Sequence, residues 1–131
     1  MVKRMLRGAA MVMALSFLLA GCSKSESSNP VGPVASGNTF VTFVELGSVG
    51  CIPCRMMQPI MRGIEGEYGG QVRVVFHDVW TEEGKPYVKK YGIRAIPTQV
   101  FFDAKGVEYF RHEGFFPKEK LVAVLKTKGV K

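Results

Sequence analysis

Cysteine and histidine are scarce in this chain, which limits the chemistry that they can support. Among its 131 residues there are three cysteines and two histidines. Cys51 and Cys54 form a C-x-x-C motif and Cys22 stands far upstream, so no further pair remains for a structural disulfide. A zinc site on the motif would require two more ligands, and haem attachment would require histidine at position 55, which is arginine. We therefore interpret Cys51 and Cys54 as a redox dithiol and expect neither a metal nor a cofactor.

The sequence also lacks an apolar run long enough to cross a membrane. Gly8–Ala20 is apolar and uncharged, but a transmembrane helix needs about 20 such residues. Lys3, Arg4 and Arg7 precede this run, which is the pattern of a secretory signal peptide. We therefore expect residues 1–21 to be removed on export.

The end of this segment, Leu19-Ala20-Gly21-Cys22, resembles the lipobox of bacterial lipoproteins. The resemblance implies cleavage before Cys22 and attachment of a diacylglycerol to its sulfur. We therefore expect a protein that is held at the membrane by lipid in the cell envelope and faces the periplasm or the cell exterior. An ordinary secretory signal followed by an unrelated cysteine is the alternative.

Acidic residues are fewer than basic ones, 11 against 18, which gives a formal net charge of +7. Loss of the three basic residues of the signal segment reduces this charge to +4. The remaining lysines are scattered, which argues against a nucleic-acid-binding protein. Residues 22–37 begin with Cys22 and are rich in Ser, Pro and Gly, so they indicate a flexible tether. Residues 38–131 then form one small domain, which we expect to be a monomer.

Hydrophobic patterns in this domain alternate between strands and helices. A buried strand comes first, and a helix that opens at the C-x-x-C follows, with Met57, Met61 and Ile64 on its apolar face. A tight turn at Ala104–Gly106 joins the last two strands as a hairpin. The order β-α-β-α-β-β-α predicts an α/β fold with a mixed four-stranded sheet and helices on both faces. The expected strands are 39–46, 72–79, 98–103 and 107–111, and the expected helices are 51–68, 82–91 and 117–128.

At several positions the domain resembles the thioredoxin family. Pro53 precedes the second cysteine of the motif, and Pro59 follows that cysteine by five residues. Tyr91–Thr98 is similar to the segment that leads into the family's cis-proline, and Gly106 and Gly114 match glycines near the terminal hairpin. The resemblance implies the minimal thioredoxin fold, because the tether occupies the stretch that opens full-length thioredoxin.

Two positions depart from the family, and a third matches it. Gly50 stands where thioredoxin has a tryptophan before its first cysteine, and Val74 falls near the place of a lysine beside the buried acid. That acid itself matches Glu45, six residues before Cys51. A carboxyl group among apolar neighbours should have a raised pKa and could exchange a proton with Cys54. An exposed glutamate at a strand edge is the alternative.

The roles of the other site residues follow from the helix start and from the resemblance. Cys51, at the helix N-terminus, should have a lowered pKa and attack substrate disulfides, and Cys54 should resolve the mixed disulfide. The resemblance implies a cis Pro97 beside the dithiol and a preceding Ile96 that offers its backbone to a substrate strand. A trans proline that opens a strand is the alternative. The expected substrate-binding residues are Ile52, Pro53, Ile96 and Pro97.

These features predict an exported thiol–disulfide oxidoreductase that reduces protein disulfides. Proline before the second cysteine, a motif without histidine and Ile96 resemble reducing thioredoxins more than oxidases. A reductase in an oxidising compartment would draw its electrons from a membrane dithiol. A disulfide oxidase or isomerase is the first alternative. The second is a copper-delivery protein that adds a histidine or the thioethers of Met56, Met57 or Met61 to the two cysteines. Helical spacing favours core packing for Met57 and Met61.

Overall fold

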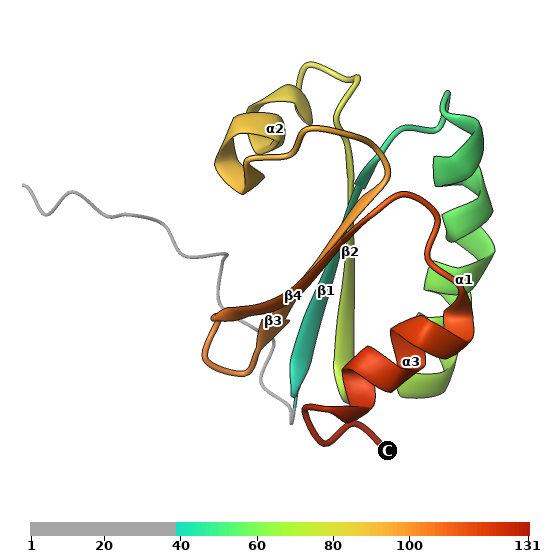
Figure 1. Cartoon of the computed structure of the whole chain (residues 1–131), viewed down its shortest axis with the longest axis vertical. Coiled ribbons are helices and arrows are strands. Elements are labelled where there is room, and N and C mark those ends of the chain that lie inside the picture. Colours follow the sequence, from blue (N-terminus) through green and yellow to red (C-terminus); the bar gives the residue numbers. More distant parts are fainter. Residues whose placement is uncertain (1–38) are drawn as a thin grey trace, which may run out of the picture.

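The computed structural model describes residues 39–131, so the signal segment, Cys22 and the tether lie outside the described residues. Four strands and three helices follow in the order β1-α1-β2-α2-β3-β4-α3 (Figure 1), which confirms the predicted order. No helix in this part of the chain is long and apolar enough to span a membrane. The elements are β1 Val41–Gly47, α1 Ile52–Tyr68, β2 Val72–Asp78, α2 Lys85–Tyr91, β3 Thr98–Asp103, β4 Glu108–Glu113 and α3 Lys118–Lys126.

The strands form one mixed sheet in the order β2-β1-β3-β4. β1 is parallel to β2, with Glu45 opposite Phe76, and antiparallel to β3, with Glu45 opposite Gln99. β3 and β4 are antiparallel. The parallel pair requires the crossover through α1, whereas a short turn is enough for the hairpin. β1 therefore lies inside the sheet, with a paired strand on each side.

Helices cover both faces of the sheet, as predicted: α1 and α3 lie on one face and α2 lies on the other (Figure 1). Because side chains alternate along a strand, β1 contributes to two cores. Val41 and Phe43 pack with residues of α1 and α3, whereas Val44 and Leu46 pack with Tyr91 at the end of α2. This cover on both sides leaves every residue of β1 buried.

Helix α1 brings the C-x-x-C to one end of the sheet. It begins directly after Cys51, and its buried side chains form one stripe that faces the strands. Pro59 lies inside the helix on its exposed side. The proline removes one backbone donor, yet the helix continues to Tyr68. The buried residues of α1 are Cys54, Met57, Met61 and Ile64.

The second helix is shorter than the sequence indicates. We predicted a helix from residue 82, whereas α2 begins at Lys85. A turn precedes it, in which Thr81 Oγ1 accepts a hydrogen bond from the Gly84 N–H at 3.0 Å and donates one to the Asp78 carbonyl at 2.8 Å. A Cβ at Gly84 would lie 1.7 Å from that carbonyl oxygen. The side-chain bonds of Thr81 hold the backbone in this turn, and the helix starts only where the turn ends.

The other boundaries differ from the prediction by at most two residues. β1 begins at Val41, after the predicted start at residue 39, and includes Gly47. β4 continues to Glu113 because it pairs with β3 as far as Thr98. These differences move no side chain of the predicted site to another element.

Candidate active site

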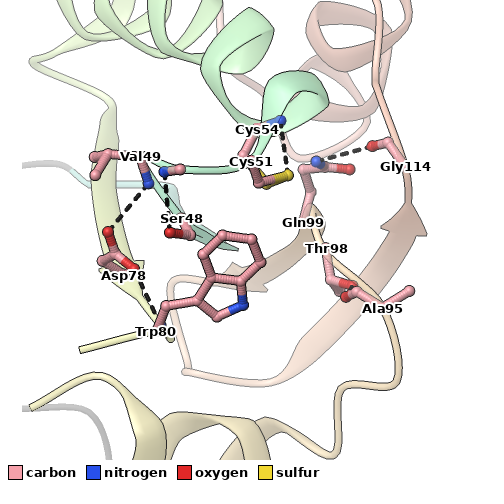
Figure 2. The surroundings of a disulfide bond; sticks show 11 residues. Ser48, Val49, Cys51, Cys54, Asp78, Trp80, Ala95, Thr98, Gln99 and Gly114 are labelled. Carbon is pink, nitrogen blue, oxygen red and sulfur yellow. Dashed lines mark hydrogen bonds between the residues drawn. A yellow bond between two sulfur atoms is a disulfide. The ribbon is translucent and has the colours of Figure 1, made fainter. Parts of the chain in front are cut away.

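Cys51 and Cys54 form a disulfide at the N-terminus of α1, and their Cα atoms are 5.2 Å apart. Cys51 is the N-cap residue, and its Sγ accepts a hydrogen bond from the Cys54 N–H at 3.3 Å (Figure 2). Cys51 keeps 9% of its surface exposed, whereas Cys54 keeps 0%. The first turn of α1 contains no acidic residue. Unpaired N–H groups and the helix dipole therefore favour a negative charge on Cys51 once the disulfide is reduced.

Cys54 lies against the end of β1, where Gly47 leaves room for it. A Cβ at position 47 would be 3.1 Å from the Cys54 Cβ and 3.3 Å from its Sγ. The ring of Phe76 on β2 borders the same space, 3.4 Å from that position. The close approach of the second cysteine therefore favours glycine here, which the sequence analysis did not identify.

Glu45 lies two residues before Gly47 in β1 and therefore on the same face of the strand. It is fully buried. Neither of its carboxyl oxygens has a hydrogen-bond partner among the described residues. Burial raises the pKa of Glu45 from 4.5 to about 8, and the side chain of Gln99 acts in the opposite direction. Val74, at the place of the family's lysine, is half-buried in the apolar core under α1. The predicted burial of Glu45 is confirmed, and its role in proton transfer remains a prediction.

Gln99 on β3 is a buried polar neighbour of Glu45 that the sequence analysis missed. The two residues are cross-strand partners, and both are fully buried. Gln99 Nε2 donates to the Gly114 carbonyl at 3.1 Å (Figure 2), whereas Oε1 has no partner among residues 39–131. Cross-strand partners have Cβ atoms about 4.5–5.5 Å apart, so the side chain of Gln99 lies beside the carboxyl of Glu45. A glutamine within the apolar run Thr98–Phe102 marks Gln99 as a buried polar residue, but its pairing with Glu45 requires the strand register.

Pro97 lies at the same end of the sheet as the disulfide, because the next residue, Thr98, pairs with Leu46 near the end of β1. The Ile96–Pro97 peptide bond is cis, as predicted. The Pro97 carbonyl accepts a hydrogen bond from the Gly114 N–H at 2.7 Å. Ile96 forms no backbone hydrogen bond with the rest of the described chain. Its N–H and C=O groups are therefore available to an added strand.

Asp78 connects the loop before Cys51 to the loop after β2. Its Oδ2 accepts from the Val49 N–H at 3.1 Å, and its Oδ1 accepts from the Trp80 N–H at 3.0 Å (Figure 2). The bond from Val49 is the main cause that lowers the pKa of Asp78. Trp80 lies with its indole against Gly50, where an added Cβ would be 2.9 Å from Cζ3. No pattern in the sequence assigns these contacts to Asp78 or Trp80.

Ile52 and Pro53 are both exposed at the start of α1, where the resemblance implies contact with substrate. Met57 and Met61 are buried in the core, as their spacing indicates, and Met56 is exposed. Among residues 39–131, no group of three or more His, Cys, Asp and Glu side chains is arranged to hold a metal ion.

Comparison with known proteins agrees with this geometry. Residues 34–129 match the family described as a thioredoxin-like domain. A thioredoxin of Staphylococcus epidermidis is 34% identical over 86 residues, which are 65% of this chain and 79% of that protein. A thioredoxin of Pyropia yezoensis is 33% identical over 88 residues, which are 67% of this chain and 79% of its own. The structure of a thioredoxin variant from Halobacterium salinarum superposes with a TM-score of 0.61 at 22% identity, over 70% of this chain and 77% of that one.

The chain belongs to the thioredoxin family. Its four-stranded mixed sheet and three helices form a thioredoxin fold. With the paired cysteines at the helix start, it is a thiol–disulfide oxidoreductase. Proteins of this kind act on the thiols and disulfides of other proteins.

Proposed function

We propose that this protein is an exported, lipid-anchored reductase of protein disulfides, with Cys51 and Cys54 as its dithiol. The position of Cys51 carries the redox assignment: it caps α1, accepts a backbone N–H and is more exposed than Cys54. Export rests on the signal-like residues 1–21, and anchoring rests on Cys22 after Leu19-Ala20-Gly21. The protein would face the periplasm or the cell exterior.

In the reduced protein, the Cys51 thiolate attacks one sulfur of a substrate disulfide. A bond forms between Cys51 and that sulfur, the substrate S–S bond breaks, and the other substrate sulfur leaves as a thiolate that takes a proton. Cys54 then loses its proton and attacks Sγ of Cys51, which closes the disulfide and releases the first substrate sulfur. The substrate gains two electrons and two protons: Cys54 gives up one of the protons, and Cys51 released the other to solvent when its thiolate formed.

We assign to Glu45 the exchange of a proton with Cys54, because Glu45 is buried two residues before Gly47, against which Cys54 lies. Because its pKa is about 8, Glu45 is mostly protonated at neutral pH. In that state it can protonate the Cys54 thiolate when an electron donor reduces the disulfide. The ionised fraction can accept the proton of Cys54 in the resolution step. Resolution should therefore become faster as the pH rises towards the pKa of Glu45.

Substrate binding is assigned to the backbone of Ile96 next to Pro97 and to the exposed Ile52 and Pro53. An extended substrate segment would pair with the free N–H and C=O groups of Ile96, as in other cases of strand addition. The reducing direction rests on Pro53 and Ile96, which resemble reducing thioredoxins. The dithiol would be regenerated by a membrane dithiol protein.

The reduction potential of the Cys51–Cys54 pair tests the direction of the reaction. A value of about −270 mV supports a reductase, and a value of about −120 mV would make the protein an oxidase. Titration of the reduced protein with Cu(I) tests the alternative function, copper delivery. Tight copper binding without disulfide turnover would favour copper delivery instead.

Mass spectrometry of the membrane fraction tests the anchor. We expect a mature chain that begins at an acylated Cys22, and a Cys22→Ser variant that is no longer acylated. A soluble mature chain that begins at another residue would contradict lipid anchoring, and it would leave the redox assignment in place.

A further inference from the structure

The indole of Trp80 occupies the space beside the residue that precedes the reactive cysteine. A Cβ at Gly50 would lie 2.9 Å from Trp80 Cζ3 and 3.2 Å from Cε3. Gly50 does not adopt a positive φ, so its backbone conformation does not require glycine. The missing side chain instead allows the indole to lie against the backbone next to Cys51.

Hydrogen bonds hold both sides of this contact. Asp78 accepts the N–H groups of Val49 and Trp80 with its two carboxylate oxygens. On the loop before Cys51, Ser48 Oγ accepts the Gly50 N–H at 3.2 Å, and Ser48 is itself buried. These bonds hold the backbones of the two loops that meet at the indole (Figure 2).

Although the ring lies against Gly50, 61% of Trp80 is exposed. The exposed apolar residues Val49 and Ile52 flank the same loop, at 64% and 66% exposure. An exposed indole costs free energy in water unless a ligand covers it. Three exposed apolar side chains therefore lie within the loop before Cys51, at the first residue of α1 and against Gly50.

We propose that Trp80 selects substrates by contact with an apolar side chain next to the substrate cysteine. This inference rests on the proposed function, because it concerns the polypeptide that the dithiol attacks. A substrate strand that places its sulfur at Cys51 brings its neighbouring residue over the indole. Aromatic contacts of this kind change a rate by about three- to tenfold. The substrate class is thus a polypeptide disulfide whose cysteines are flanked by apolar or aromatic residues.

Two peptides test this selection. In one, a single cysteine is flanked by leucine and phenylalanine; in the other, serine and glycine replace them, and each peptide is supplied as its disulfide-linked dimer. The reduced full chain reacts with each dimer, with Cys22→Ser in every sample so that only the dithiol is active. Acid quenching and chromatography give the second-order rate constant for each peptide, and the ratio of the two constants is the preference.

We expect the wild type to prefer the apolar peptide by about three- to tenfold and Trp80→Ala to bring the ratio close to one. Trp80→Phe should keep most of the preference. Gly50→Ala should lower it although the indole is intact, because the added Cβ would displace the ring. Phe40→Ala is the matched control, since it truncates an exposed aromatic residue just before the opposite end of β1, and it should retain the full preference.

The reduction potential of each variant separates selection from structural support. If Trp80→Ala slows both peptides equally and shifts the potential, Trp80 supports the dithiol loop and the proposal is overturned. A wild type that reacts with both peptides at equal rates overturns the selection alone. A wild type that reacts with neither peptide overturns the proposed function and the selection together.

Discussion

The stability of the oxidised protein should depend on pH through Glu45, and Glu45→Gln should remove that dependence. Burial raises the pKa of Glu45 from 4.5 to about 8 in the folded protein, whereas in the unfolded chain the carboxyl is hydrated and titrates at its ordinary value. Because the folded pKa is raised, the contribution of Glu45 to stability is complete below the ordinary pKa. It is lost progressively as the pH rises from about 4.5 to about 8.

One unit of pKa corresponds to about 1.4 kcal/mol, so ionising Glu45 across the interval from 4.5 to about 8 costs the folded state at most about 5 kcal/mol. A whole domain is stable by only about 5–15 kcal/mol, so the effect is easily measured. At about pH 5 the free energy of unfolding of the variant should equal that of the wild type or be slightly lower, because the carboxyl is protonated in the folded protein. At about pH 9 the variant should be more stable than the wild type by several kcal/mol. Its new amide keeps the shape of the carboxyl and can donate to the unpaired Oε1 of Gln99.

Denaturant unfolding of the oxidised proteins between about pH 5 and pH 9 provides the measurement. The disulfide prevents the cysteines from titrating, and Glu65→Gln, on the exposed side of α1, controls for the loss of a negative charge. Burial, and next the charge of Lys90, lower the pKa of His77. The contribution of His77 to the free energy of unfolding therefore falls as the pH becomes acidic. That contribution is the same in each protein and cancels in the difference. Parallel pH profiles for the wild type and Glu45→Gln would refute the raised pKa.

Three further experiments test the same site. Alkylation of the reduced protein should label Cys51 before Cys54, with an apparent pKa below about 8.5; earlier labelling of Cys54 would reverse their roles. Gly47→Ala should destabilise the protein by about 1–3 kcal/mol, because the added Cβ would lie 3.1 Å from the Cys54 Cβ, and an unchanged thermal midpoint would contradict that close approach. Gln99→Leu should raise the pKa of Glu45 further, since the side chain of Gln99 lowers it, and stopped-flow rates of the resolution step should shift to higher pH. No shift would show that Gln99 does not act on Glu45, and a shift to lower pH would show that Gln99 raises the pKa instead.

The elements and the core of the site could be predicted because each leaves a mark in a short stretch of sequence. A C-x-x-C before an apolar stripe of period 3.6 places Cys51 at a helix start. A single carboxyl in the apolar strand around Glu45 predicts burial, and a proline before an apolar run predicts the approach to β3. These signals depend on neighbours in sequence, and the resemblance supplied the cis geometry of Pro97.

Other features depend on contacts between distant segments, which leave no local mark. The start of α2 was placed too early because the side-chain bonds of Thr81 hold a turn that helix propensity does not reveal. Gly47 looks like an ordinary turn glycine until Cys54 is placed against it. Likewise, the pairing of Gln99 with Glu45 requires the register of β1 and β3, which hydrophobic alternation leaves open by steps of two residues.

Gly50 shows how a departure from the family pattern can mislead when it is considered alone. By itself, glycine before Cys51 indicates the loss of the aromatic side chain that thioredoxin has there. The structure shows that an aromatic ring still lies beside this position, supplied by Trp80 from the loop after β2. The small residue and the large one are then two parts of one contact, because a Cβ at position 50 would collide with the indole. Their substitutions should therefore be non-additive, as expected for residues in direct contact: once Trp80→Ala has removed the ring, Gly50→Ala should have little further effect on the choice of substrate.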